Sequence, residues 1–193
     1  MLTKISRGTA PAVDPHLYLA IYSFTLFNSG LAVGSIGPII PFLAQQRHKP
    51  ETEYSILFTA RTVGSVLGLI TLRLIHRTYQ AYEHKTIAAC GIVIALMMII
   101  FIRWQTSMGE LFSFFMIGAA SYVMVSINSF CLLEVSGDKA GSWMPFAQGM
   151  FGVGALLSPL IVRFMGVSSY YAFAVSSVLM ALLNASYPPP EHS

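Results

Sequence analysis

Four polar side chains lie inside long apolar stretches of the sequence, where hydrogen-bonding groups are rare. They are Arg61, Asn28, Asn128 and Gln148. A guanidinium near the middle of a membrane helix costs about 2.5–3.5 kcal/mol on insertion scales, so it usually faces a protein interior or a water-filled path. Arg61 could hold the oxygens of a solute or a carboxylate of another helix bundle, and the amides could hydrogen-bond a polar solute. We expect all four side chains to face a common path.

Each of these residues also has a simpler interpretation. Arg61 could extend along its helix toward the headgroups, and buried amides often join helices with couplings that average about 0.6 kcal/mol. Catalysis has little support, because both aspartates, Asp14 and Asp138, lie outside the apolar stretches and no phosphate-binding loop or metal-ligand spacing occurs. We therefore expect no enzymatic activity, no cofactor and no metal. Basic residues occur singly, which argues against nucleic acid as a partner.

The elements that must position these side chains are membrane spans. Of the 193 residues, 55% are hydrophobic and only 10% are charged, against roughly a quarter charged in soluble domains. About 20 apolar residues cross a bilayer as a helix. The sequence predicts an all-α polytopic membrane protein whose partner is the lipid bilayer, with tails at 1–16 and 188–193 around a bundle at 17–187. Its six spans are expected at about 17–44, 54–75, 86–103, 111–134, 141–163 and 168–187.

Small residues at helical spacing predict close contacts between these spans. Gly64 and Gly68 are four residues apart in the second span, and the fifth span carries a stripe of small residues. The first span is interrupted by Pro38 and Pro41, which indicates either a pathway or a simple kink at Pro41. The fifth-span residues expected to pack are Gly149, Gly152, Gly154 and Pro159.

An even number of spans places both termini on the same side of the membrane. The positive-inside count is six Lys or Arg residues on that side against four on the other, which favours the cytoplasm for both termini. We expect the plasma membrane rather than an organelle. Spans one and four each carry an asparagine, two and five carry small residues, and three and six are the plainest, which indicates a repeat of three spans.

A family resemblance is carried by residues 128–163, which read NSFCLLEVSGDKAGSWMPFAQGMFGVGALLSPLIVR. This stretch resembles the major facilitator superfamily, and in particular its sodium-dependent glucose transporter-like branch. The resemblance implies one six-helix half of a twelve-helix carrier of a small polar solute such as a sugar, with spans one, two, four and five lining the path. The residues that carry it are the Gly137–Asp138–Lys139 turn, Met144, Gln148, Gly152, Gly154, Ala155 and Pro159.

The chain departs from the family pattern in two respects. The family's cytoplasmic gating loop reads GxxxDRxGRR, whereas residues 68–77 read GLITLRLIHR, so that Arg73 and Arg77 are retained but Leu72 replaces the acidic residue and Ile75 the second glycine. Alternating access also needs a second bundle. Three alternatives follow: a homodimer or a companion chain, a truncated inactive product, or a structural or regulatory subunit that binds other helices through its Gly64/Gly68 and Gly149/Gly152 faces.

Overall fold

The structure, a computed structural model, describes residues 15–48, 50–79, 83–104 and 106–187. The expected terminal tails fall almost wholly outside the described residues. Within the described ranges every regular element is a helix and none is a strand. The α-helices are α1 (Pro15–Gly34), α2 (Ile36–Arg47), α3 (Ser55–Tyr79), α4 (Glu83–Arg103), α5 (Ser107–Ser136), α6 (Ala140–Met165) and α7 (Ser169–Ser186), with short 3-10 helices η1 (Glu51–Tyr54), η2 (Gly137–Lys139) and η3 (Gly166–Ser168).

One or two helices cover each of the six expected ranges. The first range is divided at Ser35, the residue that separates α1 from α2. The division lies one turn before Pro38, whose ring excludes the carbonyl of Gly34 and which has no N–H to bond it. The interruption therefore falls nearer the middle of the range than the alternative kink at Pro41, which lies inside α2.

Four segments are long and apolar enough to cross a membrane. They are Pro15–Arg47, Glu51–Leu74, Glu83–Arg103 and Ser107–Ser186. The last segment has 80 residues and contains the three helices α5, α6 and α7, because η2 and η3 join them without a non-helical residue. By this measure the described chain has four candidate spans and not the six expected.

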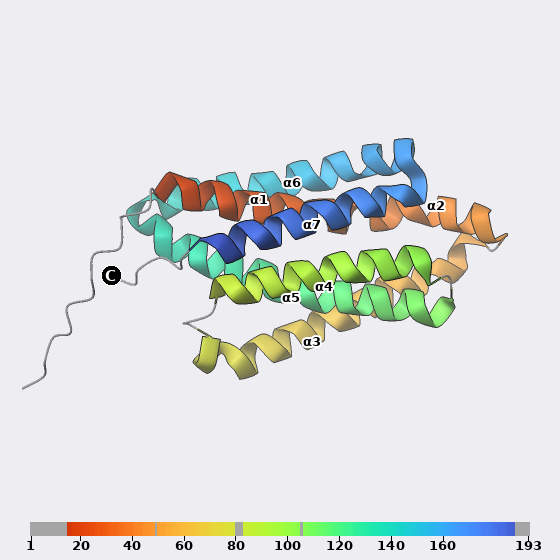
Figure 1. The fold of residues 1–193 in the computed structure, drawn as a ribbon, viewed down its shortest axis with the longest axis horizontal. Coiled ribbons are helices and arrows are strands. Elements are labelled where there is room, and N and C mark those ends of the chain that lie inside the picture. The colour runs from red at the N-terminus through yellow and green to blue at the C-terminus, as the bar shows by residue number, and fades with distance from the viewer. Residues whose placement is uncertain (1–14, 49, 80–82, 105, 188–193) are drawn as a thin grey trace, which may run out of the picture.

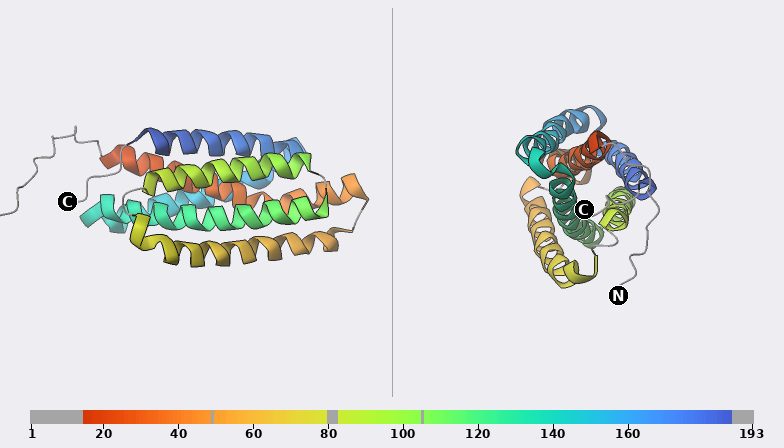
Figure 2. Two further views of the ribbon diagram at one scale, coloured as in Figure 1. Left: turned by 60° about the horizontal axis from the view of Figure 1, so that its bottom comes forward. Right: turned by 90° about the vertical axis from the view of Figure 1, so that its left-hand side faces the viewer.

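The helices run along one long axis, and helices consecutive in the chain alternate in direction from α2 onward (Figure 1). Helix α1 begins and helix α7 ends at the same end of the bundle (Figure 1). Helix α6 packs mainly on α1, α3 mainly on α5, and α4 on both α5 and α7. In the end-on view, α3 and α6 lie at opposite edges of one side of the bundle, and α4 and α7 lie on the other side (Figure 2).

An aromatic cluster fills the interior where α4, α5 and α7 meet. The ring of Phe101 lies 5.1 Å from that of Phe114 and 5.0 Å from that of Tyr170, and Tyr170 lies 5.9 Å from Phe173. All four side chains are buried. Tilted and edge-on contacts of this kind add stability beyond the area they bury, so this cluster fixes the beginning of α7 against α4 and α5.

Candidate functional site

The same close contact between two helices occurs twice in the bundle. Between α1 and α6, a β-carbon added to Gly30 would lie within 3.0 Å of the Phe151 carbonyl oxygen, and one added to Gly154 would lie equally close to the Phe27 carbonyl oxygen. Only a glycine lets two helix backbones approach this closely. The contact is reciprocal, because each helix supplies one glycine and one carbonyl.

Helices α3 and α5 repeat this arrangement. A β-carbon on Gly64 would lie within 3.0 Å of the Phe115 carbonyl oxygen, and one on Gly118 equally close to the Arg61 carbonyl oxygen. Gly68 makes a further close approach, to the Ala119 carbonyl. The predicted packing face of Gly64 and Gly68 is thus occupied by α5 of the same chain.

The two contacts define which positions are equivalent. In α1 and α5, Phe27 and Gly30 correspond to Phe115 and Gly118; in α6 and α3, Phe151 and Gly154 correspond to Arg61 and Gly64. Asn28 then corresponds to Met116, so the asparagines of the first and fourth expected spans, Asn28 and Asn128, do not occupy equivalent positions in these contacts. Arg61 occupies the place that Phe151 holds in the other contact.

Asn28 and Asn128 are buried and bonded inside the bundle. Asn28 Nδ2 donates to Ser177 Oγ at 3.1 Å, which joins α1 to α7. Asn128 Nδ2 donates to the Tyr22 carbonyl oxygen at 3.2 Å, which joins α5 to α1. The exposed fractions of these two side chains are 1% and 0%. The structure therefore does not bring them to one surface with Arg61 and Gln148.

Gln148 lies on a face of α6 that other described helices leave uncovered. Its side chain is exposed, and β-carbons added to Gly149 and Gly152 would meet no described atom within 4 Å. Gly154, by contrast, is at the α1 contact described above. Pro159 has no N–H, which leaves the Ala155 carbonyl without its helical donor, and Gly34 packs against that carbonyl, with its added β-carbon 2.6 Å from the oxygen.

Arg61 lies near the middle of its candidate span, ten residues after Glu51 and thirteen before Leu74. The residue is partly buried, and its Nε is a buried atom with no hydrogen-bond partner among the described residues. Helix α7 begins near the break between α1 and α2, because the Tyr170 hydroxyl lies 3.1 Å from Ser35 Oγ.

The two arginines assigned to a cytoplasmic gating loop lie on a helix. Helix α3 continues to Tyr79, so both Arg73 and Arg77 belong to its last turns. Residues 69–79 contain no glycine or proline to end the helix, which explains why the expected loop begins later. Arg73 is exposed.

A buried hydrogen-bonded cluster joins α1, α4 and α7, and the sequence did not indicate it. His84 Nε2 lies 2.8 Å from the Tyr22 hydroxyl, and His84 Nδ1 lies 3.3 Å from the Asn184 carbonyl oxygen. Asn184 Nδ2 also donates to Thr25 Oγ1 at 3.1 Å. His84 stands between the charged residues Glu83 and Lys85, yet only 3% of it is exposed. In the described part of the chain no three metal-ligating side chains gather.

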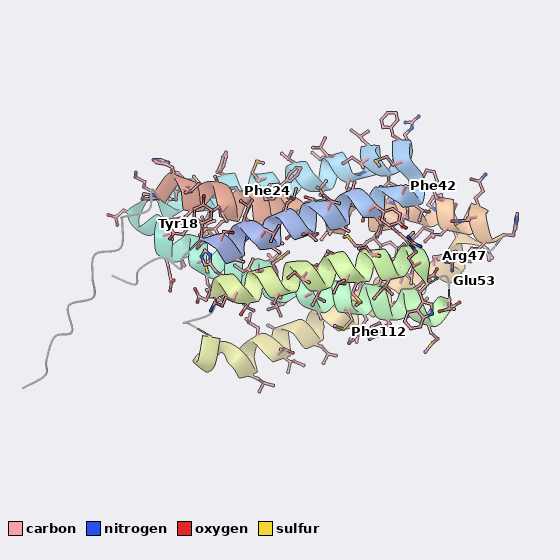
Figure 3. All side chains as sticks on the ribbon, in the orientation of Figure 1. Tyr18, Phe24, Phe42, Arg47, Glu53 and Phe112 are labelled. Atoms are coloured by element: carbon pink, nitrogen blue, oxygen red, sulfur yellow. The ribbon has the colours of Figure 1, made fainter. Side chains whose placement is uncertain are left out.

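A salt bridge that the sequence did not indicate lies at the opposite end of the bundle. Arg47, the last residue of α2, forms a salt bridge with Glu110 in the first turns of α5. Figure 3 shows Arg47 at the end of the bundle where Phe42 lies, with Tyr18 toward the other end. A cavity of about 190 Å³ lies beside it, lined by Leu43, Gln46, Arg47, Phe101, Ile102, Val167 and Ser168.

Comparison with known proteins places the chain in a family. No curated protein and no solved structure matches it. The family model described as Major Facilitator Superfamily matches residues 22–193, which includes every helix described above except the first turns of α1. Its members are membrane transporters, in keeping with the long apolar helices found here. The chain is a multi-pass membrane protein that belongs to the major facilitator superfamily.

Proposed function

We propose that this chain is one six-helix half of a secondary transporter for a small polar solute. In this proposal α1 with α2, α3, α4, α5, α6 and α7 form six membrane spans, with both termini in the cytoplasm and the plasma membrane as location. The family match over residues 22–193 is the observation that carries the proposal. The alternating directions of the helices support the six-span count (Figure 1).

A second bundle completes the carrier, supplied either by a further part of a longer protein or by another chain. The repeated contacts α1–α6 and α3–α5 support this arrangement, because they leave α3 and α6 at the two edges of one side of the bundle (Figure 2). Exposed Gln148 and the open positions Gly149 and Gly152 give α6 a small and polar face there. Such a face suits contact with helices or with a water-filled path better than contact with lipid.

Arg61 and Gln148 are the path residues that this proposal retains. Asn28 and Asn128 then act as internal joints, since both amide groups donate to partners within the bundle. Arg73 and Arg77 act at the cytoplasmic end of α3. A sugar is one member of the solute class, as the likeness of residues 128–163 to a glucose-transporting branch suggests.

The test is uptake by proteoliposomes that contain the purified chain with any bundle that accompanies it. A panel of labelled sugars, sugar acids and amino acids is offered, and the oligomeric state is measured in parallel. Uptake above that of empty liposomes for at least one solute is expected. Uptake equal to that of empty liposomes for the whole panel, by protein shown to contain two bundles, would contradict transport.

A non-transporting membrane subunit is the second candidate function. The internal bonding of Asn28 and Asn128 favours it, because it removes two amides from any path. In that case the Gly149/Gly152 face would bind a helix of another protein permanently. A Gly152→Cys variant that cross-links to a neighbouring helix in all conditions, without any uptake, would support this candidate over transport.

A further inference from the structure

Arg61 carries a charge for which the described chain offers no counter-charge. A guanidinium stays protonated at physiological pH. Among the described residues Arg47 forms a salt bridge with Glu110, and no carboxylate pairs with Arg61. The described carboxylates occur at helix ends or in turns, as in Glu51, Glu53, Glu83, Glu110, Glu134 and Asp138. A partly buried charge at the middle of a span is costly unless something compensates it.

Helix packing does not explain why this position is an arginine. Phe151 holds the equivalent place in the α1–α6 contact. Its carbonyl packs against Gly30, just as the Arg61 carbonyl packs against Gly118. An uncharged aromatic side chain therefore meets the same backbone requirement. What Arg61 adds is a positive charge and a planar set of donors, of which the buried Nε has no partner among the described residues.

Arg61 differs in burial from the two hydroxyl groups at the break in the first helix. The Tyr170 hydroxyl lies 3.1 Å from Ser35 Oγ. Tyr170 and Ser35 are buried, whereas Arg61 is only partly buried. A solute outside the described bundle can therefore reach the side chain of Arg61.

We propose that Arg61 binds one carboxylate of the transported solute, so that the carrier's substrate is a small polar monocarboxylate. This inference rests on the proposed transport function. A single uncompensated positive charge is neutralised by a single negative charge, which favours a carboxylate over a doubly charged phosphate ester. A carboxylate also matches the fork of a guanidinium with two parallel hydrogen bonds. A neutral sugar would leave the charge of Arg61 uncompensated.

The test compares two ligands that differ in one group. D-glucuronate bears a carboxylate where D-glucose bears a hydroxymethyl group. Binding to the protein in lipid nanodiscs is measured by calorimetry, with any accompanying bundle present, and inorganic phosphate is a third probe. The variants are Arg61→Phe, which copies the equivalent Phe151 and should fold, and Arg61→Lys, which keeps the charge. Arg163→Gln removes an exposed arginine from the last turn of α6 as a matched control.

We expect wild-type protein to bind glucuronate more tightly than glucose or phosphate. Arg61→Phe should weaken glucuronate binding about 10- to 100-fold, as expected for the loss of hydrogen bonds to a charged group. Arg61→Lys should lose less, and Arg163→Gln should match wild type. Equal affinity for glucose and glucuronate, glucuronate binding unchanged in Arg61→Phe, or preferential binding of phosphate would each overturn the inference.

Uptake measured beside binding separates the two proposals. Arg61-dependent binding of glucuronate without uptake would contradict transport and leave the carboxylate site standing. Uptake of glucose that Arg61→Phe does not change would sustain transport and overturn the carboxylate site. A disulfide between Arg61→Cys and a cysteine that replaces an acidic residue of the second bundle, formed under an added oxidant in every ligand condition, would also overturn it, because Arg61 would then have a protein partner.

Discussion

The Tyr22 hydroxyl donates to His84 Nε2 across 2.8 Å between two buried side chains. The direction follows from the other ring nitrogen, which lies 3.3 Å from the Asn184 carbonyl oxygen. A carbonyl only accepts, so His84 Nδ1 carries the hydrogen, and in the neutral imidazole Nε2 is then the acceptor. One neutral imidazole thereby ties α1, α4 and α7 together at a single level of the bundle.

Tyr22→Phe should lower the free energy of unfolding by about 1–3 kcal/mol, because it leaves the buried His84 Nε2 without a donor. Unfolding in mixed detergent micelles measures the change. Tyr171→Phe is the matched control: Tyr171 is exposed and its hydroxyl accepts from Arg103 Nε at 3.2 Å, so its loss should change stability by less than about 0.5 kcal/mol. Equal losses of unfolding free energy in the two variants would show that the buried hydrogen bond contributes no more to stability than the exposed one.

Gly64→Ala and Gly154→Ala should each destabilise the bundle by about 1–3 kcal/mol, since the added methyl group meets a backbone carbonyl that cannot move away alone. The two losses should be similar because the positions are equivalent. Gly149→Ala, with open space around it, should be neutral in the same unfolding assay. A loss at Gly149 as large as at Gly64 would mean that another helix covers this face in the purified protein.

Glu110→Leu should cost about 2–3 kcal/mol, because it leaves the partly buried Arg47 without its partner. Adding Arg47→Met should restore much of the loss, since a well-packed apolar pair often equals a buried ion pair. A double-mutant cycle of unfolding free energies measures the coupling. Simple addition of the two single losses would indicate that the salt bridge contributes nothing of its own.

Asn28→Ala should lower the free energy of unfolding by roughly 0.6–1 kcal/mol, the usual strength of a hydrogen bond from a side-chain amide between membrane helices. Because Asn28 donates to Ser177 inside the bundle, the KM for a transported solute should stay at the wild-type value. Ser177→Ala should reproduce the same loss, and the double variant should lose little more. A raised KM at unchanged stability would return Asn28 to the solute path.

The helical class of the chain could be predicted from the sequence because hydrocarbon imposes a simple rule. Each expected range, from 17–44 to 168–187, coincides with one or two helices, since a long uncharged stretch in lipid has to satisfy its backbone internally. The exact ends could not be predicted. Helix α3 runs on through Arg73 and Arg77 because charged residues without glycine or proline favour a helix as readily as a loop.

The sequence alone determined that this chain is apolar, helical and poor in charged residues. It also placed Arg61 inside a long apolar stretch, where a charge has a high free-energy cost. Tertiary structure decided the direction of the polar groups. It turned Asn28 and Asn128 inward, left Gln148 exposed, and paired Arg47 with Glu110. Spacing along a helix fixes which residues share a face, but only the approach of a second helix, such as Gly118 against Arg61, fixes what that face meets.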